Sequence, residues 1–271
     1  MIKAYRLRQN KEKTLKINWN TKCMLCIALS LSGTAIFFIL PYLRVLYYSL
    51  IDNQFRRNFV GFQNYITTLQ NKYFLIALRN SLLLIVICVP ILILLALVVS
   101  LLLSYCERKI KATRVAFVLP MLLPTASIVL VWKMFFQDTD SVLPIYLLFI
   151  WKNIGICIIL LTSSLTSIEK EVYEAAKIDG TTSYQLYKHI VIPLISPAVY
   201  FTTLLAIVFS FKIFKETYLY YGENYPPEHS YTLQYYMNNN FLKLDYQTLS
   251  TSAVLTSLLI LLIVISGLMI I

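Results

Sequence analysis

The chain has 271 residues, of which 58% are hydrophobic and only 14% are charged, and its formal net charge is +11. Soluble domains carry roughly 25% charged residues, so this composition excludes an ordinary soluble protein and leaves no room for a sizeable soluble domain. The basic residues gather in short segments beside apolar runs. That distribution is typical of membrane topology and of contact with anionic lipid headgroups, and it argues against nucleic-acid binding.

Residues 1–22 form a basic arm that we expect to be cytoplasmic. Its basic residues are Lys3, Arg6, Arg8, Lys11, Lys13, Lys16 and Lys22. A cleaved signal peptide would have a shorter apolar region than the run that begins at Cys23, and it would end at a small-x-small cleavage site. We therefore expect an uncleaved first span that opens one transmembrane domain over 23–271.

That domain is predicted to be an all-α integral membrane protein with six spans, because six apolar segments approach the roughly 20 residues that a helix needs to cross a bilayer. The segments are 23–46, 81–104, 114–136, 142–164, 190–213 and 248–271. Pro120 and Pro124 lie in the third segment. Such a pair either marks a kink that lines a transport path or bends the helix only for packing.

The orientation follows from the basic loops at 105–114 and 165–189, which we place in the cytoplasm with the N-terminal arm and the C-terminus. Their basic residues are Arg108, Lys109, Lys111, Arg114, Lys170, Lys177 and Lys188. On the opposite side, Asp138 and Asp140 make a short turn acidic, and the 211–247 loop balances both signs. The 44–80 loop is also basic, but its length weakens the rule.

The polar loop at 165–193 is the most informative part of the chain, since it must face water between two spans. Ser167 can cap a short helix, two glutamates follow in its first turns, and Gly180 lies where that helix must stop. Residues 181–183 offer caps to a second helix that runs toward Ile190.

Small residues on this first helix predict a docking surface. Ala175 and Ala176 would let the backbone approach a partner groove closely, and Glu174 and Asp179 could pair with cations of that groove. The alternative is an ordinary solvated connecting helix. The residues alone support the two readings equally.

The pattern over 174–193 favours docking. It reads Glu-Ala-Ala, three residues, Gly, nine residues, Ile-Val-Ile-Pro, and its defining positions are Glu174, Ala175, Ala176, Gly180, Ile190 and Pro193. This spacing resembles the signature of the permease subunits of bacterial binding-protein-dependent ABC importers, except that Ile192 replaces leucine. The Ile178-Asp179-Gly180 form resembles the carbohydrate-uptake branch.

Other segments resemble the maltose-type "F" partner of that family, at 41–42, 47–50, 60–65, 114–136 and 151–155. Two segments depart from it. The turn at 137–142 is shorter than usual, and residues 222–227 replace a Gly-Gly-Pro segment. Both lie on the outer side, so they weaken inferences about specificity and leave the docking prediction untouched.

The resemblance implies a bacterial inner-membrane importer with a second related permease, two cytoplasmic ATPase subunits and an external substrate-binding protein. The 165–193 loop would form the coupling helix that the ATPase moves. The expected cargo is a sugar or an oligosaccharide, with a polyol or a glycerol phosphate as alternatives.

The chain offers no catalytic machinery of its own. No GxxxxGK[ST] phosphate loop occurs, so ATP and Mg²⁺ are expected on the partner ATPases, and we expect no cofactor on this chain. His189 and His229 are isolated and are read as surface histidines. The five cysteines indicate neither a metal site nor a disulfide framework, despite the CxxC spacing of Cys23 and Cys26.

The candidates for a substrate pathway are Lys152, Asn153, Pro120 and Pro124. A lysine near the middle of a span usually faces the bundle interior and is a functional candidate, although it can also snorkel outward. Lys212, Lys215 and Glu216 read as an interfacial ion pair at the end of the fifth span. The 235–240 segment, rich in Tyr and Asn, could touch sugar or binding protein, but it reads better as a solvated loop.

Two other classes of protein compete with this interpretation. An ion-coupled secondary transporter would show paired intramembrane acids, and we place no Asp or Glu inside the spans. A membrane-embedded enzyme would need clustered His, Asp or Glu at one membrane face, and the sequence shows none.

Overall fold

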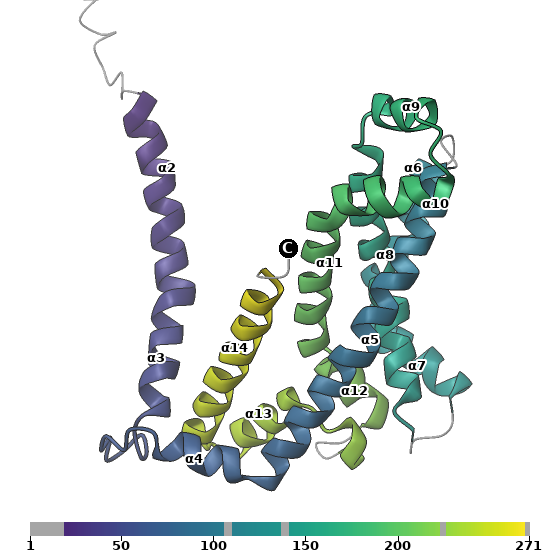
Figure 1. The fold of residues 1–271 in the computed structure, drawn as a ribbon. Coiled ribbons are helices and arrows are strands. Elements are labelled where there is room, and N and C mark those ends of the chain that lie inside the picture. Colours follow the sequence, from purple (N-terminus) through teal and green to yellow (C-terminus); the bar gives the residue numbers. More distant parts are fainter. Residues whose placement is uncertain (1–18, 106–109, 137–140, 223–225, 269–271) are drawn as a thin grey trace, which may run out of the picture.

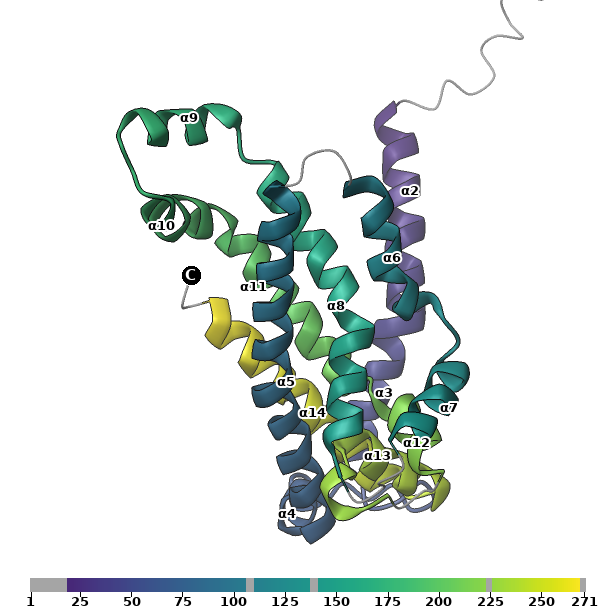
Figure 2. The same cartoon turned by 90° about the vertical axis from the view of Figure 1, so that its right-hand side faces the viewer.

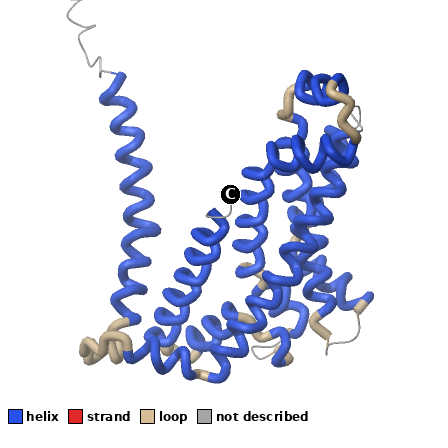
Figure 3. The backbone as a smooth tube through the Cα atoms, viewed as in Figure 1, coloured by secondary structure: helices blue, strands red, loops and turns tan. Residues whose placement is uncertain are grey.

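The computed structural model describes residues 19–105, 110–136, 141–222 and 226–268 (Figure 1). Within these ranges the regular structure is helical, and the only bridge between extended segments joins Ile51 to Phe59 (Figure 3). The all-α prediction is confirmed. Residues 1–18 of the basic arm, Arg108, Lys109, Asp138 and Asp140 lie outside the described residues.

The helices follow the apolar runs of the sequence. In chain order they are α2 (Trp19–Thr34), the π-helical η1 (Ala35–Ile39), α3 (Leu40–Ser49), α4 (Gln63–Gln70), α5 (Lys72–Tyr105), α6 (Ile110–Leu122), α7 (Thr125–Phe135), α8 (Leu143–Thr166), α9 (Lys170–Ile178), α10 (Ser183–Leu186), the π-helical η2 (Tyr187–Val191), α11 (Ile192–Phe211), α12 (Phe214–Tyr221), the 3₁₀ turn η3 (Glu228–Ser230), α13 (Leu233–Leu242) and α14 (Tyr246–Leu268).

Five of these helical runs are long and apolar enough to cross a membrane. They cover Ile27–Ser49, Lys72–Ser104, Leu143–Thr166, Ser183–Tyr221 and Tyr246–Gly267. The pair α6 and α7 makes a sixth if it counts as one broken span. The prediction of about six spans is thus confirmed, although the helices extend beyond several predicted ends.

The third span is not the continuous helix expected over 114–136. Its two parts, Ala116–Leu122 and Thr125–Phe135, meet at 101°. Pro124 precedes α7 with φ −58° and ψ 126°, so the backbone is extended there. A proline removes one donor and disfavours helical geometry in the residue before it, and here these effects turn the expected kink into a full break.

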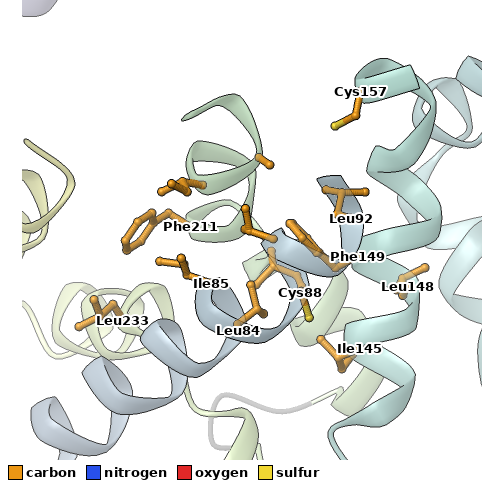
Figure 4. Close-up of a cluster of buried hydrophobic side chains, with 14 of the residues drawn as sticks. Leu84, Ile85, Cys88, Leu92, Ile145, Leu148, Phe149, Cys157, Phe211 and Leu233 are labelled. Atoms are coloured by element: carbon orange, nitrogen blue, oxygen red, sulfur yellow. The ribbon is translucent and has the colours of Figure 1, made fainter. Parts of the chain in front are cut away.

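The core lies between α5, α8 and α11, which pack against one another (Figure 4). Leu92 of α5 and Leu148 of α8 are completely buried, and Phe211 closes the cluster from α11. Cys88 and Cys157 are free and buried in it, as expected for cysteines that act as small hydrophobes. Cys106 lies outside the described residues.

Helix α6 crosses α8 at Gly155. A Cβ atom at this position would lie 1.7 Å from the backbone oxygen of Phe117. The two backbones therefore approach closely only because this residue has no side chain, which is the usual role of small residues where membrane helices cross.

The molecule has two distinct ends (Figures 1 and 2). Helices α9 and α10 lie at one end together with the starts of α2 and α6, and α4, α12 and α13 lie at the other. The starts of α2 and α6 and the loop that carries α9 and α10, all assigned above to the cytoplasmic side, thus share one end, whereas α14 stops short of it (Figure 1). The N-terminal run stands apart in Figure 1 except where α3 packs on α14, where the Tyr42 hydroxyl lies 2.7 Å from that of Ser257.

Two expectations for the end that carries α12 and α13 are wrong. The 235–240 segment is not a solvated loop, because it belongs to α13 and buries Tyr235, Tyr236 and Asn239. Burial raises the pKa of the Tyr235 phenol, so it stays protonated. His229 is not a simple surface residue either, since its Nε2 atom is buried.

Asn80 joins α5 to this same end of the molecule. Its side-chain nitrogen donates hydrogen bonds to the backbone oxygens of Glu228 and Tyr231, at 2.6 and 2.9 Å. Asn80→Asp would set a carboxylate against two carbonyl oxygens, and we expect it to destabilise the fold by about 2 kcal/mol. The measurement is the thermal midpoint of the detergent-purified complex by fluorescence-detected gel filtration.

The matched control is Asn71→Asp. The Asn71 side-chain oxygen accepts from the backbone of Tyr73 at 2.9 Å, and aspartate keeps that acceptor at a helix start. Equal midpoints for the two variants would contradict the role assigned to Asn80.

Candidate functional site

Helix α9 projects from the end of the molecule that carries α10 (Figure 2). It begins at Lys170, and Glu169 precedes it in an extended conformation without a side-chain cap. The expected cap from Ser167 is wrong. That residue ends α8, and its hydroxyl donates to the backbone oxygen of Ser164 at 2.7 Å.

The two faces of α9 differ sharply. Ala176 is only 3% exposed, whereas Ile178 is 85% exposed. Glu174 and Ala175 are exposed as well. The two alanines therefore lie on opposite faces of α9. Ala176 is buried against the rest of the chain, and only Ala175 faces outward, together with Glu174 and Ile178. This outward-facing set is called the α9 outer face below.

A tight C-terminal cap ends α9 at Gly180. The backbone nitrogens of Gly180 and Thr181 bond to the oxygens of Lys177 and Ala176, and the Thr181 hydroxyl donates to the same Ala176 oxygen at 2.8 Å. Gly180 has φ +71°, which favours glycine. Asp179 and Gly180 are exposed at this turn, as the docking prediction requires.

Helix α10 begins with the capping arrangement that the sequence suggested. The Thr182 hydroxyl accepts a bond from the Gln185 backbone, and the Gln185 side chain accepts one from the Thr182 backbone. Thr182→Ala should cost about 1 kcal/mol and speed amide exchange at Gln185 by about fivefold. Hydrogen–deuterium exchange of a peptide covering 182–190 measures it. Ser183→Ala leaves the cap in place and should change nothing.

A small apolar cluster anchors the loop to the spans. Leu165, Val191 and Ile195 are buried together, and Tyr173 of α9 packs against them. Burial raises the pKa of the Tyr173 phenol, and neighbouring Tyr187 adds to the effect. This cluster joins α9 to the end of α8 and the start of α11.

The last two motif residues continue this path. Ile190 is half-buried in η2, and Pro193 lies in the first turn of α11, where a missing donor costs least. The motif residues thus extend from the α9 outer face to the first turn of α11, which begins the apolar part of the fifth span.

The four residues predicted to line a substrate pathway have different surroundings in the structure. Lys152 faces inward, where it forms an ion pair with Glu216 and donates to the Thr125 hydroxyl at 3.1 Å. Asn153 donates to the backbone oxygen of Phe149 in its own helix at 2.8 Å. Pro120 lies inside α6, and Pro124 marks the break before α7.

Sequence reasoning missed the role of Glu216. We expected it to pair with a neighbouring lysine at the interface, but it is buried and pairs with Lys152 of another span, while Lys212 and Lys215 are exposed. An acidic residue does lie among the packed spans. Glu216 is the third residue after the turn at Lys212 and Ile213, and its position became informative only once that turn was known.

Residues 77–271 match the family described as "Binding-protein-dependent transport system inner membrane component". The chain belongs to this family. It is therefore a multi-pass inner-membrane permease subunit of an ABC importer, a transport subunit without an ATPase domain. This membership decides against the ion-coupled secondary transporter and the membrane-embedded enzyme.

Curated relatives agree with the assignment. The chain is 25% identical to the osmoprotective compounds uptake permease GgtC of Synechocystis sp., over 69% of this chain and 77% of that protein. It is 26% identical to the lactose transport permease LacF of Rhizobium radiobacter, over 83% and 85%. It is also 26% identical to the arabinooligosaccharides permease AraP of Bacillus subtilis, over 66% and 65%.

A solved structure shares the fold. A chain of a bacterial ABC transporter involved in the import of the acidic polysaccharide alginate superposes with a TM-score of 0.68 at 21% identity, over 98% of both chains. The overall arrangement of the helices is thus shared with that transporter chain.

Proposed function

We propose that this permease imports an uncharged sugar or oligosaccharide that an external binding protein delivers to the outer end. The relatives whose names specify lactose and arabinooligosaccharides support this substrate class. The observation that carries it is the ion pair between Lys152 and Glu216. It cancels the charge nearest the middle of the fourth span, which suits a neutral solute.

A charged solute is the second candidate. The chain is 26% identical to the sn-glycerol-3-phosphate permease UgpA of Yersinia pestis, over 67% of this chain and 70% of that protein. A phosphate usually requires a cation to receive it. Lys152 is already committed to Glu216, so this alternative ranks below the sugar, and a polyol remains compatible with the neutral interior.

The α9 outer face is the proposed docking site for one of two cytoplasmic ATPase subunits, which bind ATP and Mg²⁺, while this chain binds no cofactor. Glu174 and Asp179 would pair with cations of the ATPase, and Ile178 offers apolar area beside them. A second, related permease would complete the pathway. This arrangement places the N-terminal arm in the cytoplasm.

A solute panel tests the substrate class. The importer is purified with its partner subunits, reconstituted in proteoliposomes with its binding protein, and assayed for MgATP hydrolysis with neutral oligosaccharides, polyols and sn-glycerol 3-phosphate. We expect stimulation by a neutral saccharide. Stimulation by sn-glycerol 3-phosphate alone would replace the sugar with the phosphate. The chain purified alone should hydrolyse no MgATP, and measurable hydrolysis would refute the division of labour.

A further inference from the structure

Two of the membrane spans are interrupted, and both interruptions lie beside one side chain. The third span breaks between α6 and α7, which meet at 101°. The run Ser183–Tyr221 is interrupted only by a two-residue turn at Lys212 and Ile213, between α11 and α12. Helix α8 runs unbroken past both interruptions and carries Lys152. Irregular backbone at membrane depth is tolerated where surrounding protein supports it, so these interruptions need specific support.

Lys152 reaches the segment that follows each interruption. Its ammonium donates to the hydroxyl of Thr125, the first residue of α7, at 3.1 Å. It also forms the ion pair with Glu216, the third residue of α12. One side chain thus joins three helices where two of them begin.

We propose that Lys152 and Glu216 are positioning residues that hold α7 and α12 on α8 as one outer body, and that Lys152 does not contact the transported solute. The family assignment and the proposed substrate leave this role open, because either a clamp or a solute ligand is compatible with an intramembrane lysine.

Contacts farther along α7 support one body rather than a single attachment point. Trp132 of α7 stacks on Trp151 of α8 with ring centroids 5.6 Å apart, and its ring nitrogen donates to the Pro144 backbone oxygen at 2.8 Å. At the far end of α7, the Tyr220 hydroxyl of α12 donates to the Phe136 backbone oxygen at 2.9 Å. The contacts of Lys152 with Thr125 and Glu216 hold the opposite end of α7, where the helix begins.

Burial makes the pair asymmetric in its response to mutation. The Lys152 and Glu216 side chains are only 16% and 11% exposed. The second carboxylate oxygen of Glu216 is buried and has no hydrogen-bond partner among the residues that the structure describes, which leaves Lys152 as the partner of that carboxylate there. Removing one partner strands a buried charge, whereas removing both does not.

This asymmetry separates a clamp from a solute ligand. For a clamp, Lys152→Met and Glu216→Met should each do damage, and the double variant and the swap Lys152→Glu with Glu216→Lys should recover. For a solute ligand, every variant without Lys152 should fail alike. Lys133→Met is the matched control, because Lys133 is an exposed lysine of α7 that lies outside the pair.

The experiment uses the complete importer, purified with its partner subunits. Each single variant should lower the thermal midpoint by at least about 5 °C and weaken the near-ultraviolet circular dichroism of the Trp132–Trp151 stack. The double variant and the swap should restore both to within about 2 °C and about 20% of the unmodified values. The circular dichroism reports the placement of α7 specifically, which a general loss of stability would leave intact below the midpoint.

A third readout links the clamp to transport and rests on the proposed ATPase partnership. In proteoliposomes, kcat for MgATP should fall at least about threefold in the single variants with KM unchanged, and the double variant should restore it. A double variant as impaired as Lys152→Met in the first two readouts would overturn the clamp. Intact tryptophan dichroism in both single variants would also overturn it. If kcat alone fails to respond, the ATPase partnership is at fault and the clamp stands.

Discussion

Gly155→Ala is expected to abolish the recovery of folded permease. The added Cβ would lie 1.7 Å from the Phe117 backbone oxygen and 2.4 Å from its carbon, so α6 must move away from α8. Backbone atoms cannot rotate aside as a side chain can, and the cost should exceed about 3 kcal/mol. The measurement is the yield of monodisperse protein by fluorescence-detected gel filtration, which we expect to fall at least about tenfold.

The control is Gly33→Ala in α2. No atom lies within 4 Å of the Cβ position at Gly33, and alanine is the better helix former by about 1 kcal/mol, so the yield should hold or rise. Normal yield from Gly155→Ala would mean that the α6–α8 crossing has room for a side chain, contrary to the packing described above.

Glu174→Lys is expected to detach the ATPase subunits while leaving the permease in the membrane. Glu174 is exposed on the α9 outer face, so its reversal strains nothing within the chain but sets like charges against the cations proposed in the ATPase groove. Co-purification of the ATPase should fall at least about tenfold. The measurement is the ratio of ATPase to permease after affinity purification. Glu228→Lys reverses an exposed charge at the opposite end and is the control.

Gly180→Ala gives an independent test of the same surface. Gly180 and Gly222 have φ values of +71° and +70°, and in the described part of the chain no atom outside the glycine and its two neighbours lies within 4 Å of either Cβ position. Alanine therefore introduces the same backbone strain at both sites, about 1 kcal/mol. Only Gly180→Ala should lower the amount of ATPase that co-purifies with the permease, and Gly222→Ala, at the opposite end, is the control. Unchanged co-purification and unchanged MgATP hydrolysis in both Glu174→Lys and Gly180→Ala would refute docking at α9.

The sequence predicted the spans because membrane insertion depends on local apolarity, which can be read residue by residue. The break at Pro124 was only partly predictable. Many membrane helices absorb a proline as a mild kink, and the outcome depends on whether neighbours support the freed backbone. Here the Thr125 hydroxyl accepts a hydrogen bond from Lys152, and the Trp132 ring nitrogen donates one to the Pro144 backbone oxygen. Neither contact follows from spacing along one helix.

In the 165–193 loop, the ends of the helices could be predicted from the sequence, but the buried and exposed faces of α9 could not. The capping roles of Gly180 and Thr182 could be predicted from the sequence, because helix caps depend on local backbone geometry. The burial of Ala176 beside the exposed Ala175 depends on how α9 rests on the chain, which two adjacent alanines cannot indicate. The partner of Glu216 lay beyond reach for a similar reason, since it sits 64 residues away on another helix.

The π-helical turn η2 has a consequence for how members of this family can diverge. A π turn holds one residue more than the α-helical turn that it replaces. Tyr187–Val191 lies between α10 and α11, so a lineage could lose or gain one residue there while both helices are kept. Single-residue length variation among relatives should therefore be concentrated in this segment, and the same change inside α11 should be rare.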